Sequence, residues 1–236
     1  MDRRVLILGI ESATNQAGCA VGGHEGVLAA FHATRGRRHA ETLVPAIDFV
    51  LRQARVEPEE LGAIAVDIGP GLFTGLRVGV ATAKAMAQAL RLPMIGVPSL
   101  DLLAFRVRYS RRLIVAALDA RRGELFYAFY RQVPGGVQRV SEHQLGSPGD
   151  LVSELEATRE EFIAVGDGAY RYADELAGLG GLELGETSLA HPSAAALVEL
   201  AHPRAIREEF VPVWDLKPLY LRRSDAELQW GPRASV

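Results

Sequence analysis

Residues 5–11 of the chain read VLILGIE, a run of β-branched residues and leucine that stops at an acid. An apolar run of this length is typical of a strand buried on both faces of a sheet. Residues 17–21 and 27–32 are two further apolar segments, and the residues GGHEG between them favour a tight turn. The chain therefore opens with three predicted strands, of which at least two are antiparallel.

A second copy of this pattern begins at residue 113. Residues 113–119 read LIVAALD, again an apolar strand that ends at an acid, and residues 125–130 follow Gly123 as part of an apparent hairpin. Two parts of a chain that both begin with a strand, an acid and a hairpin suggest an internal duplication. A chance match of two short segments is the alternative.

Between these copies the apolar residues change from strand spacing to helical spacing and back. Strands are predicted over residues 63–68 and 94–97, and helices over residues 41–55, 74–90 and 99–105. The first part of the chain therefore has the predicted order β-β-β-α-β-α-β-α.

An arginine-rich segment, residues 106–112, has no apolar periodicity and marks the predicted boundary between two lobes, residues 1–105 and 106–236. For the second lobe the sequence predicts a strand over residues 162–165, a helix over 170–179, a loop over 182–191 and a short helix from an N-cap at Ser193 to Ala201. An extended C-terminal tail follows.

Composition excludes several classes of protein. The 236 residues include 26 basic and 29 acidic side chains, a formal net charge of −3, which is unlike a stand-alone nucleic-acid binder. Cys19 is the only cysteine, so an internal disulfide and a cysteine-built metal site are excluded. No apolar run approaches the ~20 residues that span a bilayer. We expect a cytoplasmic protein that does not enter a membrane.

The predicted helix over residues 74–90 has few polar side chains, and they fall in one narrow stripe. Glycine and alanine recur every four residues along it, which allows another element to approach closely. We expect one face to cover the sheet and another to meet a partner. The predicted partner interface comprises Phe73, Gly75, Leu76, Arg77, Gly79, Val80, Ala83 and Lys84. The alternative is a helix buried wholly within this chain.

Residues 69–75, GPGLFTG, precede that helix and offer backbone N–H groups to an anion. Gly75-Leu76-Arg77 stands where a P-loop has Gly-Lys-Ser or Gly-Lys-Thr, so a P-loop is excluded. The alternative role of these glycines is to form the tight turn.

Glu11 and Asp119 end the two apolar strands, where an acid can position a metal-bound water near a nucleotide phosphate. Capping a turn is the commoner role of such an acid and the one that we favour. The six histidines show no metal-binding spacing and no pairing with a nucleophile. We therefore predict no catalytic residues, no metal site and no cofactor.

Three motifs together resemble the TsaB (YeaZ) family: residues 7–14, ILGIESAT, residues 38–45, RHAETLVP, and residues 69–79, GPGLFTGLRVG. Further similar segments are residues 92–97, 118–124 and 218–222. The resemblance implies an α/β protein with the two-lobed actin-like ATPase (ASKHA, ribonuclease H-like) fold and a duplicated β-β-β-α-β-α core.

The same resemblance implies a function in making threonylcarbamoyladenosine on tRNA. TsaB-like chains form homodimers, and heterodimers with a paralogous metalloprotein, TsaD, to which the small ATPase TsaE is recruited. TsaD transfers the threonylcarbamoyl group to the adenosine beside the anticodon. The implied role is that of a non-catalytic subunit that enables TsaD, with indirect contact to tRNA.

Departures from active relatives support a non-catalytic role. Ser99 and Leu103 stand where TsaD has two metal-binding histidines, and neither side chain can serve as an imidazole ligand. The nucleotide-contacting Gly-Gly of active relatives is interrupted as Gly166-Asp167-Gly168. The candidate nucleotide contacts implied are therefore only Glu11, Asp119, Gly166 and Gly168. An active ATPase or small-molecule kinase that uses Glu11 and Asp119 is the alternative; a peptidase has no supporting residues.

Overall fold

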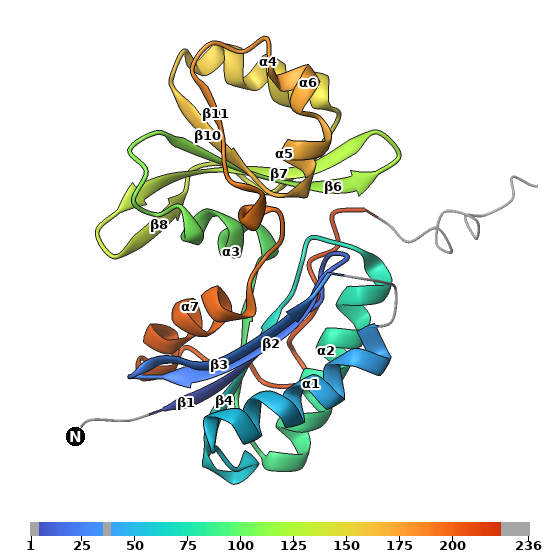
Figure 1. The fold of residues 1–236 in the computed structure, drawn as a ribbon, viewed down its shortest axis with the longest axis vertical. Coiled ribbons are helices and arrows are strands. Elements are labelled where there is room, and N and C mark those ends of the chain that lie inside the picture. The colour runs from blue at the N-terminus through green and yellow to red at the C-terminus, as the bar shows by residue number, and fades with distance from the viewer. Residues whose placement is uncertain (1–4, 35–38, 223–236) are drawn as a thin grey trace, which may run out of the picture.

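The computed structural model describes residues 5–34 and 39–222, which form two α/β lobes (Figure 1). The first lobe contains a five-stranded sheet in the order β3-β2-β1-β4-β5. Its strands are β1 (Leu6–Glu11), β2 (Ala17–Gly23), β3 (Gly26–Ala33), β4 (Leu61–Asp67) and β5 (Met94–Val97). The β1–β2 and β2–β3 pairs are antiparallel, whereas β1–β4 and β4–β5 are parallel.

The second lobe repeats this arrangement strand for strand. Its sheet has the order β11-β10-β6-β7-β8, so that β6, β7, β8, β10 and β11 take the places of β1, β2, β3, β4 and β5. The bounds are β6 (Leu113–Arg121), β7 (Glu124–Val133), β8 (Gly136–Arg139), β10 (Phe162–Val165) and β11 (Leu182–Leu184), with β9 (Gln144–Gly146) paired to β7. The predicted duplication and the α/β class are confirmed.

Helices cover both faces of the first sheet (Figure 1). The helices are α1 (His39–Ala54), α2 (Phe73–Leu90), α3 (Ser99–Arg106), α4 (Pro148–Thr158), α5 (Asp167–Arg171), α6 (Ala173–Leu176) and α7 (Ala194–Ile206), with 3-10 turns at Pro58–Glu60 and Thr187–Leu189. Leu8 and Ile10 of β1 pack in one core cluster with α1 and α2, whereas Ile7 packs in another with α7. β1 is therefore buried on both faces, as its continuous apolar run predicts.

The predictions for residues 170–191 are partly wrong. The single predicted helix is two short ones, α5 and α6, because the backbone of Tyr172 leaves the helical region at φ −111° and ψ 30°. The predicted loop contains β11, whose three residues are too few to show alternation but pair in parallel with β10. Helix α7 continues five residues beyond the predicted end at Ala201.

The C-terminal part of the chain returns to the first lobe. Helix α7 follows the predicted lobe boundary in sequence, yet it packs on the first sheet, where Leu197 and Ala201 contact the cluster around Ile7. Residues 211–222 then run past the first sheet to the second lobe. Leu219 N donates to Ile68 O at 2.7 Å, and Arg222 Nη1 donates to Ala120 O at 2.9 Å. Residues 211–222 thus connect the two lobes. The division of the chain after residue 105 stays a prediction.

No helix among residues 5–34 and 39–222 is long and apolar enough to cross a membrane.

Candidate functional site

Helix α2 directs its small residues toward its own sheet. Gly75, Leu76, Gly79, Val80 and Ala83 are all buried. The chain's own elements therefore cover these five residues in the single chain, and their place in the partner interface stays a prediction. Spacing by four shows which residues share a helix face, but it does not show which neighbour that face meets.

The end of β1 explains why these small residues are needed. Ser12 Oγ donates to Gly75 O at 2.9 Å, and a Cβ atom on Gly79 would lie 2.2 Å from Ser12 Oγ. A side chain at position 79 would therefore displace the Ser12 hydroxyl from its hydrogen bond to Gly75 O. The spacing therefore records close packing inside the first lobe.

The outer face of α2 forms an apolar groove with α1. The groove has a volume of about 550 Å³ and is lined by Val44, Ile47, Asp48, Leu51, Pro58, Ala81, Thr82, Ala85 and Met86. The Val44 side chain is 61% exposed, whereas Ile47 and Leu51 form the buried floor. The residues on α1 were missed at the sequence level, although Val44, Ile47 and Leu51 recur at the spacing of a single helix face. An exposed apolar groove of this kind is typical of an interaction surface.

The other three predicted interface residues remain accessible. Arg77 is exposed, and Phe73 and Lys84 are half-buried. Arg77 Cζ lies 4.1 Å from the centroid of the Phe73 ring, and the Phe73 ring lies 5.2 Å from that of Tyr220. Phe73 and Arg77 thus form a cation–π stack at the start of α2.

The glycine-rich turn before α2 packs against the loop after β1. A Cβ atom on Gly71 would lie 2.2 Å from Ala13 O, and Leu72 N donates to that oxygen at 2.7 Å. Gly69 has φ +98°, a conformation that glycine adopts without strain. Packing and turn geometry therefore explain these glycines without a bound phosphate.

A small cavity lies between the lobes. It has a volume of about 10 Å³ and is lined by Ala13, Thr14, Gly71, Leu72, Leu118, Asp119, Arg121 and Asp167. A space of this size holds about one water molecule.

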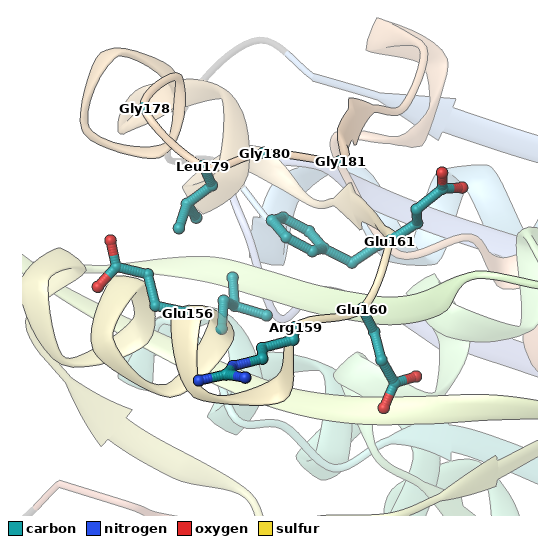
Figure 2. A pocket seen from close by; sticks show the side chains of 10 residues that line it. Glu156, Arg159, Glu160, Glu161, Gly178, Leu179, Gly180 and Gly181 are labelled. Atoms are coloured by element: carbon teal, nitrogen blue, oxygen red, sulfur yellow. The ribbon is translucent and has the colours of Figure 1, made fainter.

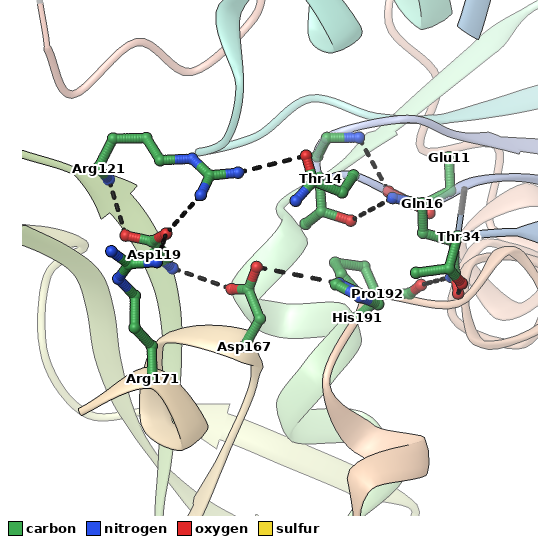
Figure 3. A network of polar contacts seen from close by, with 12 residues as sticks. Glu11, Thr14, Gln16, Thr34, Asp119, Arg121, Asp167, Arg171, His191 and Pro192 are labelled. Atoms are coloured by element: carbon green, nitrogen blue, oxygen red, sulfur yellow. Dashed lines mark hydrogen bonds and ion pairs between the residues drawn. The ribbon is translucent and has the colours of Figure 1, made fainter. Parts of the chain in front are cut away.

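Asp119 pairs with arginines of its own chain (Figure 3). Asp119 Oδ2 lies 3.0 Å from Arg121 Nη1 and 3.6 Å from Arg171 Nη1. Arg121 Nη2 also donates to Asn15 Oδ1 of the first lobe at 3.3 Å. Asp119 N donates to Asp167 Oδ1 at 2.9 Å, and burial raises the pKa of Asp167 to about 6. The chain itself thus supplies the cations for Asp119, and Arg121 bonds to residues of both lobes.

The two other candidate nucleotide contacts also have a packing role. Gly166 has φ +105°, and a Cβ atom on it would lie 2.0 Å from Ala117 O of β6. A Cβ atom on Gly168 would lie 2.5 Å from Leu125 Cδ2. Close contact with β6 and β7 therefore accounts for glycine at both positions.

Glu11 lies apart from Asp119, beside an acid that sequence reasoning missed. Glu11 and Asp67 end the neighbouring parallel strands β1 and β4, and both are buried. Burial raises the pKa of Asp67 to about 7. Burial, and then the charge of Asp67, raise the pKa of Glu11 well above its usual range. The signal for this pair was available, because the carboxyl ends of neighbouring parallel strands meet at one edge of a sheet.

Ser99 and Leu103, the two positions compared with metal-binding histidines in the resemblance to TsaD, make structural contacts here. Ser99 Oγ donates to Asp67 Oδ1 at 2.6 Å, and Leu103 lies in an apolar cluster. Among the residues that the structure describes, there is no group of three or more His, Cys, Asp or Glu side chains arranged to hold a metal ion.

A hollow on the second lobe offers little chemistry. It measures about 440 Å³, and Figure 2 shows it between the end of α4 and residues 178–181. Its charged side chains are exposed, and two of them are already paired, Glu160 with Arg131 at 2.8 Å and Glu161 with Arg112 at 3.5 Å.

Comparison with known proteins agrees with the resemblance seen in the motifs. A sequence profile of the TsaD family, described as tRNA N6-adenosine threonylcarbamoyltransferase, matches residues 30–230. The TsaB protein of Escherichia coli is 30% identical over 93% of this chain and 96% of its own length. The TsaB protein of Bacillus subtilis is 28% identical over 96% of this chain and 98% of its own length. Both are named as tRNA threonylcarbamoyladenosine biosynthesis proteins.

Solved structures show the same fold. YeaZ from Pseudomonas aeruginosa superposes with a TM-score of 0.81 at 25% identity, covering 92% of this chain and all of that one. An ROK hexokinase from Thermus thermophilus superposes with a TM-score of 0.51 at 13% identity, covering 86% of this chain and all of that one, a likeness of fold alone. The fold is thus the two-lobed actin-like ATPase fold, and the chain belongs to the TsaB (YeaZ) family.

Proposed function

We propose that this chain is a non-catalytic subunit in the formation of threonylcarbamoyladenosine on tRNA. The named function of its TsaB relatives supports the pathway. The observation that carries the subunit role is the apolar groove between α1 and α2, which has Val44 at its edge and Ala81 and Ala85 on its α2 wall. Groove and pathway together favour an assembly in the cytoplasm over a stand-alone enzyme.

The groove's occupant, in this proposal, is a helix pair of related structure. The chain forms a homodimer through α1 and α2, and exchanges it for a heterodimer with a TsaD-like protein that recruits a TsaE-like ATPase. The groove is apolar apart from Asp48 and Thr82, which suits a helical partner better than RNA. We therefore assign contact with tRNA to the partner.

The state of the inter-lobe cleft supports the absence of catalysis. The cavity beside Asp119 has a volume of about 10 Å³, and Arg121 and Arg171 already neutralise that acid. Glu11, the other acid that a kinase or ATPase would use, is fully buried and faces Asp67 rather than the cleft lining. These features disfavour the alternative of an active ATPase or kinase.

Light scattering coupled to size exclusion tests the proposal on the purified chain, alone and mixed with the TsaD-like protein of the same organism. We expect a homodimer alone and a one-to-one heterodimer in the mixture. An Ala85→Glu variant, which places a charge on the exposed wall of the groove, should remain folded and monomeric. A wild-type monomer that ignores the TsaD-like protein would refute the subunit role.

A further inference from the structure

Two buried carboxyl groups lie side by side where β1 and β4 end, and each has one oxygen without a partner. Glu11 Oε1 accepts from Ala13 N at 2.8 Å. Asp67 Oδ1 accepts from Gly69 N at 2.8 Å and from Ser99 Oγ at 2.6 Å. The second oxygens, Glu11 Oε2 and Asp67 Oδ2, are buried without a hydrogen-bond partner.

Among residues 5–34 and 39–222, no ion pair joins either carboxyl group to a basic side chain. The Gln16 amide and Ala13 N–H stabilise the Glu11 anion, and Gly69 N–H and the Ser99 hydroxyl stabilise that of Asp67. A neighbouring acid disfavours the ionised form of each group: Asp67 acts on Glu11, and Asp101 of α3 acts on Asp67.

Basic groups on the neighbouring elements that the structure describes are engaged elsewhere. Across the cleft, Arg121 and Arg171 pair with Asp119. On α2, Arg77 is exposed and stacks on Phe73. Two ionised carboxylates at this position would therefore repel each other in a region that water does not reach.

We propose that Glu11 and Asp67 form a proton-binding site, in which one proton lies between Glu11 Oε2 and Asp67 Oδ2. The proton makes one of the unpartnered oxygens a donor and the other an acceptor, and it removes one of the two charges. It also ties β1 to the start of α2, because Asp67 holds Gly69 N and Ser12, next to Glu11, binds Gly75 O.

The site makes folding depend on pH in a defined direction. The pKa of Asp67 is about 7 in the folded protein against an ordinary value of 3.8, so the folded state binds more protons than the unfolded chain between these values. The contribution of Asp67 to stability therefore falls as pH rises from about 4 to about 7, and the raised pKa of Glu11 adds a fall in the same direction.

Infrared spectroscopy and thermal unfolding test the proposal on the whole chain. Near pH 6, wild type should show the C=O band of a protonated carboxylic acid that the double variant Glu11→Gln/Asp67→Asn, in which both acids are replaced, lacks. Asp167, with a pKa of about 6, contributes to both spectra and cancels in the difference. The melting temperature of wild type should fall between about pH 5 and about pH 8, and that of the double variant should change much less.

In the double variant the amide oxygen at position 67 can still accept from Ser99 and Gly69, and one amide can donate to the other, so the protonated state is imitated without an acid. The single variants Asp67→Asn and Glu11→Gln, each of which keeps one acid, serve if the double variant folds poorly, and each should show a smaller slope than wild type. The control is Glu156→Gln on the exposed face of α4, which should keep the wild-type slope. Equal slopes in wild type and the double variant, with no acid band in the difference spectrum, would overturn the proposal. So would stabilisation of wild type by Na⁺, K⁺ or Mg²⁺ at fixed ionic strength without an acid band, because a metal ion would then occupy the site.

Discussion

Val44 gives the sharpest test of the groove, because a matched valine lies outside it. Val44 on α1 is 61% exposed, and Val140, between β8 and β9 of the second lobe, is 48% exposed. Replacing either one by glutamate leaves the new charge in water in the monomer, so neither variant should disturb the fold of the single chain. Only Val44→Glu should weaken an assembly built on α1 and α2.

The magnitude follows from the exposure of Val44. Burying a whole valine side chain stabilises by ~1.5–3 kcal/mol, and scaling by the exposed 61% gives about 1–2 kcal/mol at each Val44 that a partner covers. An unpaired carboxylate in a covered groove costs several kcal/mol more before water or a shift in side-chain position relieves it. A total of at least about 3 kcal/mol corresponds to a dissociation constant raised by about 100-fold or more.

Analytical ultracentrifugation of wild type, Val44→Glu and Val140→Glu over a range of concentrations measures this change directly. The same three proteins titrated with the TsaD-like protein give the heterodimer constant. If Val44→Glu and Val140→Glu associate as tightly as wild type, the partner does not cover the groove and the reasoning fails.

Three other outcomes follow from the packing of α2 and the cleft. Gly71→Ala should lower the free energy of unfolding by about 1–3 kcal/mol, because its methyl group meets the backbone carbonyl oxygen of Ala13, whereas Gly136→Ala, with open space around it, should change that free energy little; chemical denaturation measures both. Val80→Glu places a charge in the core, at a site only 6% exposed, and should unfold the chain rather than yield a folded monomer. Circular dichroism should show the loss of secondary structure. Magnesium-dependent ATP hydrolysis by the pure chain should not exceed a protein-free blank, and turnover that disappears in Asp119→Asn would instead identify an active enzyme.

The parts of the fold that sequence predicts well are those where one strand or helix carries its own signal. The run at residues 5–11 predicts a strand buried on both faces, and its echo at 113–119 predicts the second lobe. Orientation was harder to infer, because the residues of α2 can face either the sheet or a partner with the same spacing. Only contacts distant in sequence, such as Ser12 with Gly75, decide which neighbour the small residues meet.

The site was harder to predict than the fold for a related reason. Val44 belongs to an ordinary amphipathic pattern, and its exposure depends on where α2 lies beside α1. An acid such as Asp67 at the end of a strand is common. The pair with Glu11 follows only from the parallel pairing of β1 with β4. Of the predicted nucleotide contacts, Gly168 lies beside Asp119, whereas Glu11 lies beside Asp67. The pairing of Asp119 with Arg121 and Arg171 could not be predicted, because the positions of arginine side chains are not encoded in local spacing.

The return of α7 to the first sheet has a consequence for how the protein is made on the ribosome. Ile7, Ala63 and Ile95 lie on a sheet face whose cover, Leu197 and Ala201, is translated about a hundred residues after the last strand of that sheet. An emerging first lobe must therefore expose an apolar surface while the second lobe is synthesised. The order in which the two lobes complete their cores therefore differs from the order in which they are translated. The second lobe can close its core first, and the first lobe is completed only when α7 packs on it.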